Sequence, residues 1–392
     1  MAFTPDSANL ATVYGGPNRI IMANWGNYRT HGFYNVLDFG ATGDGSHDDT
    51  SAFQAAIDAA VALKGTLVIP APTSAWIISD ELLIADPSST QTFMNIEANG
   101  RITWAGGNNK SIFHSKGWKN SYVRGGRILV NNASGIKAWH IDDPTGYTSS
   151  SSVSFYDSLL SITGTSANCY GYYCGDPVAG QDVSLLNWVN CKIDAVDNSL
   201  GNVGWFAAHS NCLGFTWIAG GGTKLGKMVQ MNSSPLGGGA HTWTGAVAGY
   251  NLVDFEFAAN GSSSFNIIGG RFENGNRFWS DIGYPASGVT TATLVRVDGP
   301  TIMAYDPSDD ILFAISAPGY YDLSPYIFNS GGSNYTADMI HLAGGAGGYG
   351  RLKLGGVLQA ADPCYTVDSG HWTVDRTAVI KSSAGAATGL FT

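Results

Sequence analysis

The sequence predicts an all-β fold in which many short strands stack as a solenoid, preceded by one short helix. Charged residues make up 13% of the 392 residues, about half the share of an average domain. Glycine is abundant, with 52 residues, while 44% of the chain is hydrophobic, which excludes a disordered chain. No long helical pattern follows Leu63. This composition is typical of short stacked strands joined by tight turns.

The first unit in chain order is a strand, a turn, a helix and a second strand between Phe33 and Ile84. Glycines interrupt a short apolar run, because glycine enters the left-handed region freely. Asp48, Asp49 or Thr50 can cap the helix by accepting hydrogen bonds from its free amides. The helix itself is predicted by an apolar stripe at helical spacing, formed by Phe53, Ala56, Ile57, Ala60 and Val61.

This first unit resembles a known family. NVLDFGATGDGSHDDTSAFQAAIDAA followed by GTLVIP is similar to the opening of the pectin-lyase-like superfamily, and in particular to its branch of phage tailspikes and capsule depolymerases. The resemblance implies a right-handed parallel β-helix whose N-terminal end is closed by the short helix. It covers a structural cap and therefore implies a fold more strongly than a reaction. The carboxylates of this stretch are expected to serve turns and caps: Asp38, Asp44, Asp48 and Asp49.

The chain divides into three predicted parts. Residues 1–32 are a polar lead-in or linker, residues 33–84 are the cap, and residues 85–392 are the parallel β-helix with inserted loops and a closing C-terminal segment. A small C-terminal β-domain is the alternative for the last part.

Two segments of the solenoid repeat visibly. YVRGGRI at 122–128 and NIIGGRF at 266–272 each give an apolar strand, a diglycine corner and an arginine. The stretch from Gly125 to Gly269 would hold about six rungs at roughly twenty to twenty-five residues per rung.

The charge and hydropathy of the chain exclude some partners. The net charge is −10 and no basic run occurs, so nucleic acid is not an expected partner. No stretch is long and apolar enough to span a membrane, and no secretory signal is seen at the start. We therefore expect a virion tail or extracellular location, reached by cell lysis.

The five cysteines match no metal or redox motif, which favours buried free thiols over a Cys169–Cys174 bridge.

No sequence motif assigns a cofactor or a reaction. A Ser-His-Asp elbow, a P-loop, a dinucleotide fingerprint and HExxH are absent, as are the polygalacturonase motifs and the DPHD motif of mannuronan epimerases, enzymes of the same implied fold. YDPSDD at 305–310 resembles DPHD only loosely. Its Asp306, Asp309 and Asp310 are a candidate calcium site, with a solvated turn as the alternative. Apart from such a calcium ion, we expect no cofactor.

Acidic residues on predicted strands are the leading catalytic candidates. In GYNLVDFEF, strand alternation points the phenylalanines inward and Asp254 and Glu256 outward, and in GGRFENG it points Arg271 and Glu273 outward. The separation of Glu256 and Glu273 along the chain is close to one rung, so they are expected roughly 4.8 Å apart. Such a pair could supply an acid and a base or nucleophile, and its spacing suits a retaining hydrolase. An exposed polar ladder is the alternative.

The middle third of the chain holds further candidates. Asp194 and Asp197 form a second possible acidic pair, with turn capping as the alternative. His209 and His241, in loop-like segments, are candidate bases for a polysaccharide lyase, which also needs a cation to stabilise the enolate. Aromatic residues that could stack on sugar rings, about half of them expected in the core instead, are Trp205, Trp217, Trp243, Tyr250 and Trp279.

We therefore expect a depolymerase similar to phage tailspikes, which cleaves a bacterial surface or exopolysaccharide by glycoside hydrolysis with paired carboxylates. The enzyme class is implied by the family resemblance. A polysaccharide lyase on the same fold is the first alternative, and a non-catalytic glycan-binding or structural fibre protein is the second. The resemblance also implies a parallel homotrimer, which the high share of aromatic residues relative to charged ones, 12% against 13%, favours.

Overall fold

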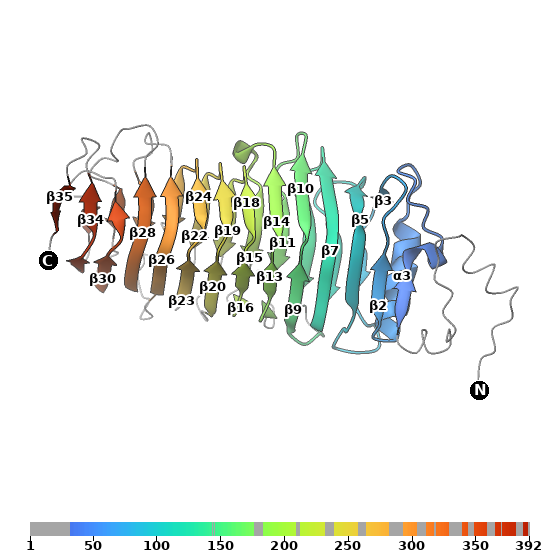
Figure 1. Cartoon of the computed structure of the whole chain (residues 1–392). Helices are drawn as coiled ribbons and strands as arrows, with labels where there is room; N and C mark the ends of the chain where they lie inside the picture. The colour runs from blue at the N-terminus through green and yellow to red at the C-terminus, as the bar shows by residue number, and fades with distance from the viewer. Residues whose placement is uncertain are drawn as a thin grey trace, which may run out of the picture.

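The chain is an all-β right-handed parallel β-helix with a short α-helix at its N-terminal end, as the sequence predicts (Figure 1). The computed structural model describes residues 32–142, 144, 146–175, 183–208, 212–231, 239–257, 264–281, 293–303, 311–316, 319–328, 339–343, 349–358, 365–369, 371–381 and 387–390. Among these residues, no helix has the length and apolar character needed to cross a membrane. The expected linker, residues 1–32, lies outside this set except for Gly32.

Helix α3 (Thr50–Ala62) buries the predicted stripe completely, since Phe53, Ala56, Ile57, Ala60 and Val61 are at most 2% exposed. It packs against the 3-10 helix η1 (Val36–Phe39) and the first strands, at the end of the solenoid (Figure 1). Asp48 accepts a hydrogen bond from the Thr50 amide at 3.0 Å. The buried Asp49 carboxylate instead accepts from the amides of Thr42, Gly43 and Ile77. These carboxylates serve turns and caps, as expected.

Each rung of the solenoid contributes strands to three faces. One face is a separate sheet of 11 parallel strands, called here the 11-stranded sheet. Its members are β4 (Leu82–Ile84), β6 (Ser111–Lys116), β8 (Lys137–Asp142), β11 (Tyr170–Cys174), β15 (Val203–Ala207), β19 (Lys227–Met231), β22 (Val253–Phe257), β25 (Arg277–Ser280), β27 (Phe313–Ile315), β29 (Ile340–Ala343) and β32 (Tyr365–Ser369).

The other two faces form one bent sheet of 24 strands. Its first face holds β1 (Phe33–Asn35), β2 (Thr66–Ile69), β5 (Asn95–Trp104), β7 (Lys119–Asn131), β9 (Ser150–Tyr156), β12 (Val183–Ser184), β13 (Asn187–Val189), β16 (Cys212–Leu213), β17 (Thr216–Ile218), β20 (Ala240–Thr244), β23 (Ser264–Ile268), β26 (Thr293–Met303), β28 (Gly319–Phe328), β30 (Tyr349–Leu354) and β33 (His371–Arg376). Strands β5, β7, β26 and β28 continue around the corner onto the second face.

The second face of the 24-stranded sheet is completed by shorter strands. They are β3 (Trp76–Ile78), β10 (Leu159–Thr163), β14 (Lys192–Ala195), β18 (Gly221–Thr223), β21 (Val247–Gly249), β24 (Arg271–Glu273), β31 (Val357–Leu358), β34 (Val379–Lys381) and β35 (Ala387–Leu390). Strand β35 pairs antiparallel with β34 at the C-terminal end. A second 3-10 helix, η2 (Asn198–Leu200), follows β14.

Rungs are longer than the sequence suggested. Five register steps, rather than six, connect Val123 to Ile267, and they pass through Phe155, Trp188, Trp217 and Trp243. The longest of these steps runs from Phe155 to Trp188, and the steps then shorten toward Ile267. The diglycine corners do lie where two faces meet, with φ of 71° and 83° at Gly125 and Gly126.

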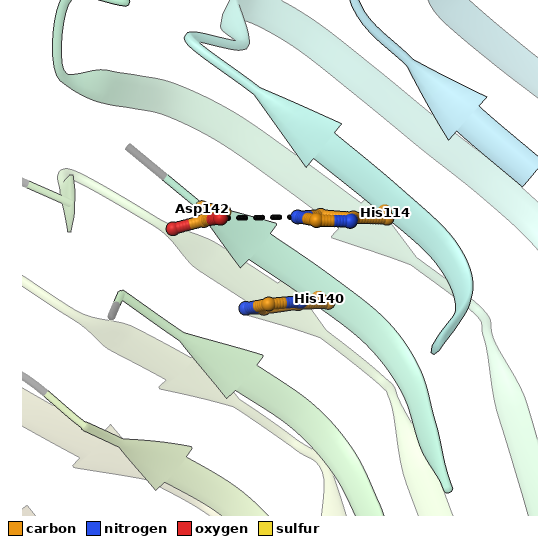
Figure 2. A group of neighbouring side chains, drawn as sticks. All are labelled: His114, His140 and Asp142. Carbon is orange, nitrogen blue, oxygen red and sulfur yellow. Dashed lines mark hydrogen bonds and ion pairs between the residues drawn. The ribbon is translucent and has the colours of Figure 1, made fainter. Parts of the chain in front are cut away.

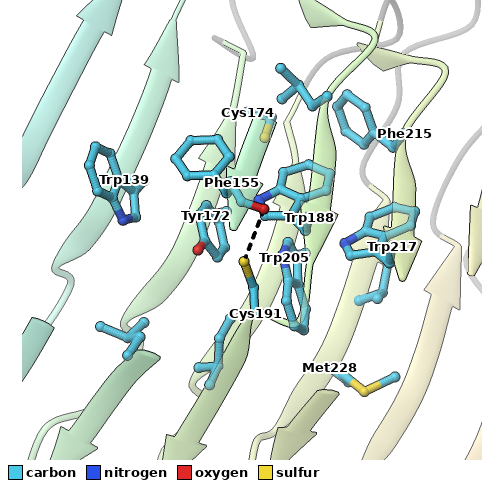
Figure 3. Close-up of a cluster of buried hydrophobic side chains, with 14 of the residues drawn as sticks. Trp139, Phe155, Tyr172, Cys174, Trp188, Cys191, Trp205, Phe215, Trp217 and Met228 are labelled. Atoms are coloured by element: carbon cyan, nitrogen blue, oxygen red, sulfur yellow. Dashed lines mark hydrogen bonds between the residues drawn. The ribbon is translucent and has the colours of Figure 1, made fainter. Parts of the chain in front are cut away.

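The core is a column of stacked aromatic rings (Figure 3). Trp188 and Trp217 stack at 5.1 Å between ring centroids, and Trp217 and Trp243 at 5.3 Å. Four of the five aromatic residues proposed for sugar stacking lie in this core: Trp205, Trp217, Trp243 and Trp279 are 2%, 1%, 0% and 1% exposed. The prediction was wrong for these four, because parallel rungs place equivalent inward positions directly above one another.

The four cysteines of the described residues are buried and free: Cys169, Cys174, Cys191 and Cys212. The Cys191 thiol donates to the Phe155 carbonyl oxygen at 3.5 Å (Figure 3). Burial raises the pKa of this thiol to about 11. The expectation of buried free thiols is confirmed for these residues.

Candidate functional site

The outer surface of the 11-stranded sheet carries a column of polar and aromatic side chains. Parallel register aligns one residue from each of six consecutive strands, β6 to β22: His114, His140, Tyr173, Phe206, Gln230 and Glu256. A neighbouring column contributes Lys137, Tyr170, Val203 and Lys227. We call these two columns the outer strip.

A histidine cluster lies at the N-terminal end of the outer strip (Figure 2). His114 Nδ1 lies 3.0 Å from Glu81 Oε1, and His114 Nε2 lies 3.0 Å from Asp142 Oδ2. The His114 and His140 rings stack at 4.2 Å between centroids with 13° between their planes, because the two residues are register partners on β6 and β8. His140 Nδ1 lies 3.2 Å from Ser111 Oγ.

The two histidines have opposite pKa shifts. Burial alone would lower the pKa of His114, but the hydrogen bonds to Asp142 and Glu81 outweigh it and raise that pKa above its ordinary value. Burial, with the nearby positive charges of His114 and Lys137, lowers the pKa of His140 to about 3. Glu81 is partly buried, which favours its neutral form, yet its bond to His114 leaves its pKa below the usual value.

Next to the histidines, the outer strip carries a small aromatic cluster that is separate from the main core. Tyr170, Tyr173 and Phe206 pack with ring centroids 4.9–5.2 Å apart, beside Val203 and Ala208. The Lys137 ammonium lies 3.8 Å from the centroid of the Tyr173 ring, a cation–π contact. Aromatic rings with a few placed polar groups are typical of small-molecule and sugar sites.

Glu256 lies at the C-terminal end of the outer strip. Its carboxylate pairs with Lys227 at 2.6 Å and accepts a hydrogen bond from Gln230 at 2.9 Å. The glutamate side chain is 20% exposed. The prediction that Glu256 points away from the core is correct, while Phe255 and Phe257 point inward, at 0% and 6% exposure.

The predicted Glu256–Glu273 pair does not form. Glu256 is on β22 of the 11-stranded sheet, where its register partners are Gln230 and Ser280. Glu273 is on β24 of the other sheet and bonds to Arg271 at 2.8 Å. The separation of the two glutamates along the chain is shorter than one rung, so it leads to another face of the same rung. The geometric basis for pairing these two carboxylates was wrong.

Asp254 is also placed differently from the prediction. It is 1% exposed and accepts a hydrogen bond from the buried Asn251 side chain at 2.8 Å. Asp254 and Phe255 are consecutive residues of β22, and both are buried. Asp254 is therefore an interior carboxylate, not an outward one, because simple alternation fails where the strand bends.

The remaining candidates lie away from the outer strip. Asp194 is on β14 and accepts from Thr223 Oγ1 at 2.7 Å. Asp197 caps η2 through the Ser199 amide at 2.8 Å, which lowers its pKa, so its turn-capping alternative holds. Tyr250 is 50% exposed and follows β21. His241 is buried on β20 rather than in a loop.

Two expected features fall outside the described residues. They are the candidate base His209 and the candidate calcium ligands Asp306, Asp309 and Asp310. Among the described residues, one group of side chains could hold a metal ion, formed by His114, His140 and Asp142.

The histidine cluster was not predicted from the sequence, although the sequence carries a signal for it. SIFHSK and KAWHID each place a histidine directly after a buried aromatic residue, Phe113 and Trp139. The spacing from His114 to His140 is the length of one rung, since the two residues are register partners on neighbouring strands. A repeated aromatic–histidine pair at the rung period predicts two imidazoles on the same outer column.

Comparison with known proteins supports the fold. The family model for rhamnogalacturonase A and epimerase, pectate lyase-like, matches residues 33–92. The match lies in the cap region, and it agrees with the parallel β-helix that the structure shows. Mannuronan C5-epimerases AlgE5 and AlgE1 from Azotobacter vinelandii are each 67% identical over 39 residues, which is 10% of this chain. The matched stretch spans only 4% and 3% of those epimerases.

Solved structures with a similar fold are distant in sequence. The endo-xylogalacturonan hydrolase from Aspergillus tubingensis is 12% identical, with a TM-score of 0.47 over 87% of this chain and 100% of the hydrolase. The ORF18 protein of Geobacillus virus E2 is 13% identical, with a TM-score of 0.43 over 91% of this chain and 62% of the viral protein. Likeness at this level carries no argument about activity.

Proposed function

We propose that this chain binds a polysaccharide along the outer strip and degrades it. The observation that carries the proposal is the aromatic cluster outside the main core, in which the partly exposed Tyr170 packs on the buried Tyr173 and Phe206. Lys137 and the Glu256–Lys227 pair flank this cluster. Sugar rings have apolar faces that stack on aromatic side chains, while their hydroxyls bond to charged and amide groups. Such a cluster on a solenoid surface suits an extended glycan lying across several rungs.

The matching relatives agree with a polysaccharide as the substrate. The family model over residues 33–92 is named for rhamnogalacturonase and epimerase, and the 39-residue matches are to enzymes named for mannuronan. The family model covers the cap region and not the outer strip beyond residue 92. These matches support the substrate class, and a tailspike-like depolymerase on a virion tail or outside the cell is the setting we propose for it.

Glycoside hydrolysis is the reaction we propose first. The outer surface of the 11-stranded sheet offers carboxylates at both ends of the outer strip, with Asp142 beside the histidines and Glu256 beyond the aromatic cluster. Carboxylates are the acid, base and nucleophile of most glycoside hydrolases. Elimination is the second candidate, because Lys137 and Lys227 place two cations on one column, where they could bind the carboxylates of a uronic acid polymer.

A glycan panel with matched tyrosine variants tests the proposal. We expect Tyr170→Ala to weaken binding about tenfold, since it removes one stacking ring worth roughly 1 kcal/mol or more. Tyr156→Ala is the control, because Tyr156 is a partly exposed tyrosine on β9 of the other sheet. New reducing ends without near-ultraviolet absorption indicate hydrolysis, whereas absorbing unsaturated ends indicate elimination. Equal losses in both variants, or no binding to any glycan, would contradict the proposal.

A further inference from the structure

The histidine cluster presents two imidazole nitrogens and one carboxylate to a common point (Figure 2). One ligand atom from each of His114, His140 and Asp142 lies within 4.8 Å of the other two. Metal–nitrogen and metal–oxygen bonds near 2.0–2.1 Å with tetrahedral angles place ligand atoms roughly 3–3.5 Å apart. The 3.0 Å separation of His114 Nε2 and Asp142 Oδ2 already falls at this spacing.

Each histidine has its other nitrogen held by a neighbouring oxygen. His114 Nδ1 faces Glu81 Oε1 at 3.0 Å, and His140 Nδ1 faces Ser111 Oγ at 3.2 Å. When Nδ1–H donates to these oxygens, Nε2 of each ring carries the lone pair. Metal-binding histidines commonly donate their second N–H to a carboxylate or another acceptor, which fixes the tautomer and the ring orientation.

His140 Nε2 supplies the second and independent observation. His140 is 8% exposed, and its Nε2 is buried with no hydrogen-bond partner among the described residues. A buried polar atom without a partner costs free energy, so such atoms are rare in native structures. A metal ion at the common point would satisfy this nitrogen.

We propose that His114, His140 and Asp142 bind one divalent transition-metal ion of the Zn²⁺ type. Two imidazoles and one carboxylate suit Zn²⁺, Co²⁺ or Ni²⁺, whereas Ca²⁺ and Mg²⁺ prefer oxygen ligands. Glu81 orients the His114 ring through its Nδ1. Three protein ligands leave a fourth position open for water or a ligand oxygen, as in catalytic rather than structural zinc sites. The site shares Asp142 with the proposed hydrolysis, but the inference concerns metal binding, and its test does not depend on polysaccharide cleavage.

Metal titration of the full chain tests the site. After chelator treatment, isothermal calorimetry should show one equivalent of Zn²⁺ bound, and thermal unfolding should shift to higher temperature in Zn²⁺ because the ion binds the folded state. His140→Phe and Asp142→Asn should each weaken binding at least a hundredfold. His241→Phe is the matched control, since His241 is another buried histidine that lies far along the solenoid and should leave Zn²⁺ binding unchanged.

Any of three results would contradict the proposed metal site. No Zn²⁺ binding by the natural sequence, equal binding by His140→Phe and Asp142→Asn, or Ca²⁺ competing at equal concentration would each do so. Far-ultraviolet circular dichroism shows whether His140→Phe is folded. If it is not, Asp142→Asn decides, because it keeps the shape of the side chain. Co²⁺ provides a second readout: its visible absorption bands should appear with the natural sequence and disappear with Asp142→Asn.

Discussion

Buried polar residues of the solenoid interior differ in how well their hydrogen bonds are satisfied. Asn251 accepts from the Leu225 amide at 2.9 Å and donates to the Gly222 carbonyl and to Asp254. Asn202 links the Cys169 amide to the Ser166 carbonyl in the same way. His241 is 3% exposed, and the one bond described for its ring is from the Phe215 amide at 3.4 Å. Its neighbours are aromatic rings, so nothing described there stabilises a charged imidazole.

We expect His241 to make stability depend on pH. Burial lowers its pKa from 6.5 to about 4, so the unfolded chain binds a proton more readily than the folded chain between these values. The contribution of neutral His241 to the free energy of unfolding is therefore fully present above pH 6.5. It is lost as pH falls toward 4, by roughly 3 kcal/mol. Urea unfolding of the natural sequence and of His241→Phe from pH 7 to 4 measures the difference between them.

His241→Phe should be tolerated because its register partner on the next rung is Phe265. The variant should lose less stability than the natural sequence over this pH range, whatever the other groups contribute. Parallel curves for the two proteins would show that His241 does not titrate in the window.

Local elements could be predicted from the sequence, and the rung length could not. The stripe of α3 and the inward phase of Phe255 and Phe257 depend on neighbours a few residues away, so they follow from periodicity alone. The rung length depends on how many residues each corner and insertion takes. The register step from Phe155 to Trp188 is much longer than the step from Trp243 to Ile267. The number of residues between two carboxylates therefore could not show whether they lie on the same face.

The two diglycine corners allow a steric effect to be separated from backbone strain. Gly125 and Gly269 have similar φ, 71° and 61°, so alanine is strained at both. A Cβ at Gly125 would lie 2.3 Å from the Ala98 carbonyl oxygen of the rung before it, whereas a Cβ at Gly269 meets nothing within 4 Å. We expect Gly269→Ala to cost roughly 1–2 kcal/mol, the cost of a left-handed alanine.

Gly125→Ala should cost clearly more than Gly269→Ala, because the backbone of the adjoining rung must also move. Chemical denaturation of the two variants under identical conditions measures both free energies of unfolding. Equal costs would mean that the rungs shift without resistance at this corner and that close approach is not what requires glycine there.

Across the whole molecule, the candidate site depends on which face each strand joins. Glycine content, low charge and the opening motif were enough to predict the solenoid, since these features are spread along the chain or local. The outer strip brings together residues from His114 to Glu256 through register across six strands. A tryptophan on a strand gives the same sequence pattern whether its side chain faces the core, as that of Trp205 does, or faces the outer surface. That is why the aromatic candidates were misassigned.

We expect the chain to form a parallel homotrimer. Apolar side chains remain exposed on the 24-stranded sheet: Leu185, Ile218, Val247, Ile268, Leu294 and Tyr326 are 43–62% exposed. Ile218 and Ile268 lie two register steps apart on the first face of this sheet with Thr244 between them, and Val247 lies on its second face. Burying these exposed side chains between subunits is favourable because it removes apolar surface from water.

Sedimentation velocity at micromolar concentration should therefore give three times the chain mass of 41.2 kDa. Val247→Glu combined with Ile268→Glu should shift the protein toward the monomer, because charges buried between subunits without partners are costly. Leu63→Glu is the control, since Leu63 is 64% exposed but follows α3 at the N-terminal end, away from those side chains. A single 41.2 kDa species from the natural sequence would rule out a stable trimer at this concentration and leave these apolar side chains open to solvent.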